Sequence, residues 1–171
     1  MVLLNEDSSR PISKKYTFTE LFRDERQEQV IRKLCDPLLQ SFSEEGSHRR
    51  YSANKGGLIF TYGVTNSGKT HTVLGTDDEP GILQYLFQQL SKPFLLLPVE
   101  VYNDEFFPLV LPRTKIHLLE CSGMMEFKDY DPIEITNDNM EGILTQIKNN
   151  RSQKSTVHNA KSSRSHAIFR I

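Results

Sequence analysis

The sequence has few cysteines, no long apolar run and almost no net charge, and each shortage argues against a class of protein. Its two cysteines, Cys35 and Cys121, lie far apart without the spacing of a zinc site or a disulfide framework. No apolar run approaches the roughly 18 residues of a membrane-spanning helix, and no charged-then-apolar leader opens the chain. We therefore expect a soluble intracellular chain with reduced thiols.

The charge balance gives no reason to expect nucleic acid or a membrane as a partner. The 21 Lys and Arg residues almost cancel the 22 Asp and Glu residues, which leaves a formal net charge of -1. A length of 171 residues with 37% hydrophobic residues suits one domain with a real core. We expect a polar N-terminal segment over residues 1–15 and the ordered domain over residues 16–171.

Residues 63–70 form a motif that is typical of phosphate binding. Residues 63–70 read GVTNSGKT, which matches the phosphate-loop pattern GxxxxGK[ST], and they follow the apolar run 57–62, which predicts a strand. Two glycines let successive backbone N–H groups converge on phosphate oxygens, and the next helix adds its partial positive charge. We expect Lys69 to reach the outer phosphates and the Thr70 hydroxyl to bind Mg²⁺. The alternative is an accidental match, which the preceding strand argues against.

The remaining pattern alternates helices and strands. Helical spacing of apolar residues, or Gly and Pro at the ends of a segment, predicts helices over residues 26–42, from 70 to about 75, 82–90 and 139–148. Apolar and β-branched runs predict strands over residues 16–18, 57–62, 94–102 and 167–171. A further strand pair is expected at 115–119 and 132–136. Pro37 should kink or restart its helix, and Pro98 argues for an edge or a bulge. The alternation predicts an α/β sheet sandwiched by helices, with the ligand at the strand carboxyl ends.

A second group of polar residues lies near the end of the chain. Residues 159–166 read NAKSSRSH and precede an apolar strand start. Alone, this stretch is typical of a flexible, hydroxyl-rich loop. Beside a phosphate loop, its serines become candidate ligands for Mg²⁺ or a terminal phosphate, and Arg164 becomes a candidate for a directional ion pair.

Together these two segments resemble a known family. YGVTNSGKTHT at 62–72 and NxxSSRSH at 159–166 resemble the phosphate loop and switch I of kinesin motor domains, and the likeness extends over about residues 16–171. The amino-acid sequence of the phosphate loop is most similar to that of the mitotic-kinesin-like cytokinesis motors. The resemblance implies a P-loop NTPase fold with a kinesin-motor-like central sheet flanked by helices.

The resemblance also implies roles for individual residues. The ATP phosphates would be held by the loop and the start of its helix: Gly63, Val64, Thr65, Asn66, Ser67, Gly68, Lys69, Thr70 and His71. Thr70 and Ser163 would complete the Mg²⁺ shell. Ser162 would face the terminal phosphate, Asn159 would help to position the attacking water, and Arg164 would pair with a glutamate of a second switch.

The implied partners and location follow from the same family. The complete motor would couple microtubule-stimulated ATP hydrolysis to movement along microtubules, and it would form a homodimer through regions outside this chain. The expected location is the cytoplasm and cytoskeleton, including the mitotic spindle or its midzone. The segment 121–130 corresponds to a loop that can touch tubulin in kinesins.

The sequence departs from the family pattern in several places. No Arg-x-Arg-Pro motif precedes Tyr16, and Ile31 stands where an aromatic residue usually stacks on the base, which leaves only apolar contact. The Asp-x-x-Gly of the second switch does not follow within the sequence. We therefore expect the first half of a motor, incomplete at both ends, which does not hydrolyse ATP by itself and is marginally stable or prone to aggregation.

Two alternatives stay open at this point. The chain could be a truncated or degenerate kinesin relative that binds nucleotide, or only partners, without productive hydrolysis. A weaker alternative is an unrelated phosphate-loop ATPase or kinase. Whether the sequence is a fragment, a truncated isoform or a gene model does not follow from its residues.

Overall fold

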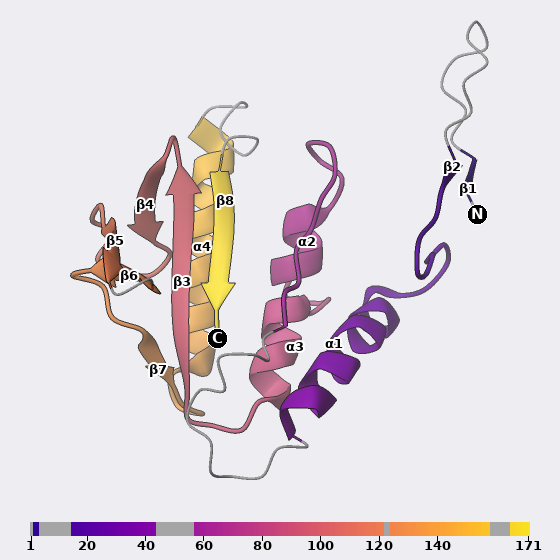
Figure 1. Ribbon diagram of the computed structural model, residues 1–171, viewed down its shortest axis with the longest axis horizontal. Coiled ribbons are helices and arrows are strands. Elements are labelled where there is room, and N and C mark those ends of the chain that lie inside the picture. Colours follow the sequence, from indigo (N-terminus) through magenta and orange to yellow (C-terminus); the bar gives the residue numbers. More distant parts are fainter. Residues whose placement is uncertain (1, 4–14, 44–56, 122–123, 158–164) are drawn as a thin grey trace, which may run out of the picture.

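The computed structural model describes residues 2–3, 15–43, 57–121, 124–157 and 165–171 (Figure 1). The helices are α1 (Gln27–Ser43), α2 (Lys69–Leu74), α3 (Ile82–Gln89) and α4 (Met140–Val157). The strands are β1 (Val2–Leu3), β2 (Lys15–Tyr16), β3 (Phe94–Tyr102), β4 (Glu105–Pro108), β5 (His117–Cys121), β6 (Met124–Lys128), β7 (Ile133–Ile135) and β8 (Ser165–Arg170). None of these described helices has the length and apolar character needed to cross a membrane.

The nine-residue strand β3 is the centre of the main sheet. A two-residue turn at Asn103 and Asp104, with φ of 50° and 59°, joins it to its antiparallel neighbour β4. Positive φ at both turn positions matches the right-handed twist of a hairpin. β7 pairs with residues 94–96 and β8 with residues 97–102, both antiparallel. Figure 1 draws β4 and β7 on one side of β3 and β8 on the other.

Pro98 lies inside this central strand, so the expectation of an edge or a bulge there was wrong. Its carbonyl accepts a hydrogen bond from the Leu109 N–H at 2.9 Å, which places its backbone groups on the β4 side. On that side, pairing with β7 ends at Leu96 and pairing with β4 begins at Val99. The N–H that proline lacks would therefore face the gap between the β7 and β4 ladders. No strand among the described residues accepts a hydrogen bond at that place, so the proline removes none from the sheet.

The two strands expected at 115–119 and 132–136 exist but do not pair with each other. β5 pairs with β6, which the sequence reading missed, from His117 opposite Lys128 to Cys121 opposite Met124. β7 joins β3 instead. The short connection between β5 and β6 closes their hairpin with little loss of chain entropy, whereas pairing β5 with β7 would have to close a longer loop.

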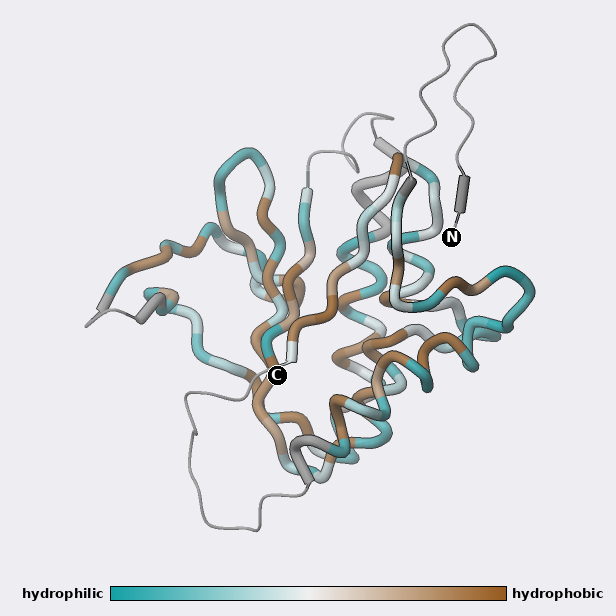
Figure 2. Tube along the Cα trace, turned by 45° about the vertical axis from the view of Figure 1, so that its right-hand side comes forward, coloured by the Kyte–Doolittle hydropathy of each residue, from teal (hydrophilic) through white to brown (hydrophobic). Residues whose placement is uncertain are grey.

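The two faces of β3 carry different neighbours. Leu96 belongs to a core with Leu74 of α2, Phe87 of α3 and Ile147 of α4. Leu97 and Val99 point the other way and pack with Ile116, Phe106 and Phe127. The described helices thus cover one face rather than sandwiching the sheet, and the β5–β6 hairpin lies at the other. In Figure 2 the hydrophobic stretches meet in the middle of the molecule, and several peripheral loops are hydrophilic.

A third layer forms where α1 packs on α3. Ile31 and Cys35 of α1 are buried against Ile82, at the start of α3. The helix continues unbroken past Pro37, so the expected restart did not occur. A proline inside a helix costs about 3 kcal/mol. Burial of the residues on this face offsets that cost. The helix expected at 139–148 is also confirmed, and it extends to Val157.

The apolar run before the phosphate loop is extended, but the strand expected at 57–62 was wrong. Ile59 packs against the Ile31 cluster, whereas Leu58, Phe60 and Tyr62 point outward and are 83%, 76% and 93% exposed. Alternation of this kind is strand-like. No other strand in the described part of the chain pairs with this run, and a strand is defined by its hydrogen-bonded neighbour.

Candidate functional site

The phosphate loop forms a tight turn that ends at the start of α2. The Ser67 N–H donates to the Val64 carbonyl at 3.2 Å, and Asn66 and Gly68 have positive φ values of 64° and 88°. A Cβ at Gly63 would lie 2.6 Å from the Ser67 hydroxyl oxygen. The backbone therefore requires glycine at position 68, where the conformation is left-handed, whereas a side chain at position 63 would displace the Ser67 hydroxyl.

The Lys69 side chain folds back over this loop. Its Nζ donates to the Gly63 carbonyl at 2.9 Å and to the Val64 carbonyl at 2.5 Å. The ammonium is thus held at the loop, beside the first turn of α2. The N–H groups of a first turn have no partner within the helix, so they and the ammonium offer donors and positive charge at one place.

The phosphate loop and the first turn of α2 fit a nucleotide phosphate. The left-handed Gly68 shapes the loop, and the backbone N–H groups and the Lys69 ammonium supply the donors. Thr65, Asn66, Ser67 and Thr70 are exposed, and Thr70 lies in the first turn of α2. A hydroxyl there is a hard oxygen ligand of the kind that Mg²⁺ accepts beside phosphate oxygens. In the described part of the chain, no cluster of three or more His, Cys, Asp or Glu side chains could hold a metal. A divalent ion here would rely on hydroxyl and phosphate oxygens.

The acidic loop after α2 is fixed beside this helix. Thr76 and Glu79 bond each other through two hydrogen bonds, of 2.9 and 3.1 Å, and the Glu79 carboxylate lies 3.3 Å from His71 Nε2. Gln27 of α1 donates to the Pro80 carbonyl at 3.0 Å, and Lys148 of α4 donates to the Thr76 carbonyl at 3.2 Å. The loop is therefore tied to α1, α2 and α4, and it brings the Glu79 carboxylate next to His71.

A pocket of about 690 Å³ opens between the phosphate loop and α4. It is lined by Asn66 of the loop, by residues of α2, α3, α4 and the acidic turn, and by the first residue of β8: Thr70, Leu74, Gly75, Asp77, Gln84, Glu141, Leu144, Thr145, Lys148, Asn149, Arg151 and Ser165. One pocket therefore touches both Thr70 and Ser165, which lie 95 positions apart in the sequence. That volume is within the usual range for ligand pockets.

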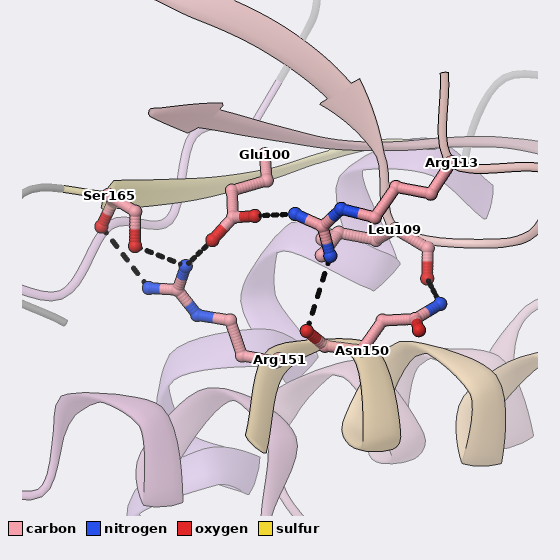
Figure 3. A network of polar contacts seen from close by, with 6 residues as sticks. All are labelled: Glu100, Leu109, Arg113, Asn150, Arg151 and Ser165. Atoms are coloured by element: carbon pink, nitrogen blue, oxygen red, sulfur yellow. Dashed lines mark hydrogen bonds and ion pairs between the residues drawn. The ribbon is translucent and has the colours of Figure 1, made fainter. Parts of the chain in front are cut away.

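A buried ionic network lies behind this pocket (Figure 3), and sequence reading missed it. Glu100 of β3 is fully buried and bonds Arg113, and its other carboxylate oxygen accepts from Arg151 Nη1 at 2.6 Å. Arg151 also donates to Ser165, at 2.7 Å to the hydroxyl and 3.2 Å to the carbonyl oxygen. The sequence signal was the single charged residue in the apolar run 94–102, because a buried charge needs a partner.

Several predicted site residues lie outside the described residues. These are Asn159, Ser162, Ser163 and Arg164, so their roles remain predictions, as does the second Mg²⁺ ligand. Ile31 is described, and its predicted contact with the base was wrong. It is only 2% exposed because it packs in the α1–α3 core, so it offers no surface to a ligand.

The prediction of reduced cysteine thiols can be checked at Cys35 but not at Cys121. Cys35 is a buried free thiol, and burial raises its pKa to about 11. A thiol with so high a pKa is inert at neutral pH, in agreement with a structural role. The side chain of Cys121 lies outside the described part of the chain.

Comparison with known proteins identifies the family. The sequence model of the kinesin motor domain matches residues 3–171, which is almost the whole chain. The chain belongs to the kinesin motor domain family. The predicted fold class, a P-loop NTPase of the kinesin motor type, is thereby confirmed.

Individual kinesins show the same relationship. The chain is 30% identical to Kinesin-related protein 13 of Dictyostelium discoideum over 183 aligned positions, which cover 93% of the chain and 13% of that protein. It is 30% identical to Kinesin-like protein 6 of Schizosaccharomyces pombe over 92% of the chain and 22% of that protein. Human Kinesin-like protein KIF18B is 35% identical over 66% of the chain and 15% of its own length. The chain therefore spans less than a quarter of these relatives.

Proposed function

We propose that this kinesin-family chain is the ATP-binding portion of a microtubule motor that couples ATP hydrolysis to movement. The observation that carries the proposal is the geometry of the phosphate loop, in which Lys69 lies across the carbonyls of Gly63 and Val64 at the start of α2. Family membership supplies the reaction class, and the loop supplies the chemistry that the reaction requires.

Each part of the loop has a task in this proposal. Backbone N–H groups around Gly68 and the first turn of α2 bind phosphate oxygens, and the Lys69 ammonium moves from the loop carbonyls to the outer phosphates. The Thr70 hydroxyl is one ligand for Mg²⁺, which neutralises phosphate charge when it is bound. His71 would contact the nucleotide from the next position, with the Glu79 carboxylate behind it.

The predicted second half of the site is part of the same proposal. Ser163 would be the other Mg²⁺ ligand, Ser162 would face the terminal phosphate, Asn159 would help to position water, and Arg164 would make the switch ion pair. Geometry and charge stabilisation are the main contributions that a protein makes to phosphoryl transfer. These assignments rest on the resemblance of NxxSSRSH at 159–166 to switch I.

The proposed partner is the microtubule, and the proposed location is the cytoplasm and cytoskeleton, including the spindle. The β5–β6 hairpin, which ends at Lys128, is the candidate contact surface within the described residues. Asp129 and Asp131 follow it at exposed positions and would oppose an acidic filament. A homodimer would form through parts of the protein outside this chain, and the similarity to cytokinesis motors remains a subfamily proposal.

Titration of the purified chain with fluorescent ATP and Mg²⁺ tests the proposal. We expect saturable binding that weakens at least about tenfold in Lys69→Ala, because the outer phosphates lose their point charge. Lys33→Ala is the matched control, since Lys33 is an exposed lysine of α1 that pairs with Glu20 and is not held at the loop. Absence of saturable binding by the folded wild-type chain, or equal binding by Lys69→Ala, would contradict the proposed function.

A further inference from the structure

Two arginines share the buried carboxylate of Glu100, but they differ in what else they hold. Arg113 Nη1 also donates to the Asn150 carbonyl, at 3.3 Å. Arg151 instead bonds two atoms of Ser165, the side-chain oxygen and the main-chain oxygen. Figure 3 shows the two guanidinium groups on opposite sides of Glu100, with Ser165 next to Arg151.

The double contact fixes the backbone as well as the side chain of Ser165. A hydrogen bond to the hydroxyl alone would let the main chain shift, whereas the second bond to the carbonyl holds the first residue of β8 in place. The planar guanidinium presents its donors in a rigid fork, so contact with Glu100 and with both Ser165 atoms orients Arg151 completely. Arg151 is largely buried, with 15% of its side chain exposed, and this burial strengthens its charged hydrogen bonds.

Ser165 and Arg151 line the same pocket as Thr70. Asn66 of the phosphate loop and Thr70 of α2 line this pocket, as do Arg151 of α4 and Ser165 of β8, which together we call the Ser165 wall. In the proposed nucleotide-binding mode, ATP carries one phosphate more than ADP and would extend farther into the pocket that Thr70 lines. The position of the Ser165 wall therefore matters more for ATP than for ADP.

We propose that Arg151 is a positioning residue that holds the Ser165 wall at the distance required to recognise the terminal phosphate of ATP. This proposal rests on the proposed nucleotide-binding function. Arg151 acts through Ser165 and does not touch the nucleotide. Glu100 orients Arg151, and Arg113 supplies a second counter-charge to Glu100 without reaching Ser165.

The two arginines provide a matched pair of variants. Arg151→Gln and Arg113→Gln each remove one positive charge from Glu100, so both destabilise the fold by the same mechanism. Only Arg151→Gln releases Ser165. In Arg151→Gln we expect the affinity for a non-hydrolysable ATP analogue to fall about tenfold and the affinity for ADP to stay within about twofold, which is a coupling of ordinary size. In Arg113→Gln we expect the ratio of the two affinities to stay at the wild-type value.

The experiment is equilibrium titration of the wild-type chain and both variants with fluorescent MgADP and a non-hydrolysable MgATP analogue, with thermal unfolding of each chain. A changed affinity ratio in Arg151→Gln alone supports the proposal. An unchanged ratio, or the same change in Arg113→Gln, overturns it, because the effect would then be absent or a general consequence of destabilisation.

A milder variant decides the question if Arg151→Gln does not fold. Ser165→Ala removes the 2.7 Å bond and keeps the 3.2 Å bond to the carbonyl, so we expect about a threefold loss for the ATP analogue relative to ADP. An unchanged ratio in Ser165→Ala would then overturn the proposal. A wild-type chain that binds neither nucleotide would instead contradict the proposed function itself, so the two failures are distinguishable.

Discussion

Gly75 and Gly81 approach each other so closely that neither leaves room for a side chain. A Cβ on Gly81 would lie 2.4 Å from the Gly75 nitrogen, and a Cβ on Gly75 would lie 2.3 Å from the Gly81 nitrogen. Gly75 also ends α2 with a φ of 66°. This contact closes the acidic loop and sets the start of α3 against the end of α2.

We predict that Gly81→Ala destabilises the chain by about 3 kcal/mol, because its new methyl group would meet main-chain atoms that cannot rotate away. The control is Gly142→Ala in α4, where a Cβ meets nothing within 4 Å. That change should stabilise the helix by up to about 1 kcal/mol through lower chain entropy. Urea unfolding measures both, and equal free energies of unfolding for the two variants would disprove the steric argument.

The buried carboxylate gives a second prediction. Glu100→Gln should destabilise the chain by about 3 kcal/mol or more, because Arg113 and Arg151 would lose their shared counter-charge. Glu105→Gln is the matched control, since Glu105 pairs with Lys115 where both side chains are nearly half exposed. An exposed pair contributes about 0 to 1 kcal/mol. Chemical denaturation compares the two, and a similar loss in both variants would show that burial of Glu100 is unimportant.

A tyrosine on α3 gives a pH-dependent prediction. The Tyr85 hydroxyl donates to Asp36 at 2.5 Å, and this hydrogen bond raises the pKa of Tyr85 from 10.0 to about 12. A raised pKa stabilises the fold while the phenol is protonated. The contribution is complete below pH 10 and is lost as the pH rises toward 12. The difference in free energy of unfolding between wild type and Tyr85→Phe should therefore shrink across this range.

Absorbance of the phenolate provides the independent check. Burial raises the pKa of Tyr130 to about 12 as well, so Tyr85→Phe and Tyr130→Phe should each remove one late-titrating phenol from the folded chain. If Tyr85→Phe removed a phenol that titrates near pH 10 instead, the Asp36 hydrogen bond would not be present in solution.

The extended run before the phosphate loop gives a prediction about association. Leu58 and Phe60 expose apolar side chains, which favours self-association of the chain. Replacing both by Thr should reduce light scattering at a given concentration without lowering the unfolding temperature. Ile59→Thr should lower the unfolding temperature and should not reduce light scattering, because Ile59 packs against the core of α1 and α3. Unchanged scattering in the double variant would locate the association surface elsewhere.

The sequence by itself determined the features whose physics is local. The phosphate loop follows from its glycine pattern, in which Gly68 adopts a left-handed backbone, and α2 ends at Gly75 because that residue adopts a positive φ. The helix at Met140–Val157 follows from apolar spacing, and the turn at Asn103 and Asp104 from residues that tolerate a left-handed backbone. In each case the deciding bonds join residues only a few positions apart.

The tertiary structure decided the features that depend on distant partners. It paired β5 with β6 rather than with β7, left residues 57–62 without a strand neighbour among the described residues, and placed Pro98 between two ladders. It buried Ile31 in the α1–α3 core and brought Arg151 to both Glu100 and Ser165. Strand pairing and charge burial join residues far apart in the chain, so their energies depend on which neighbours the whole fold supplies.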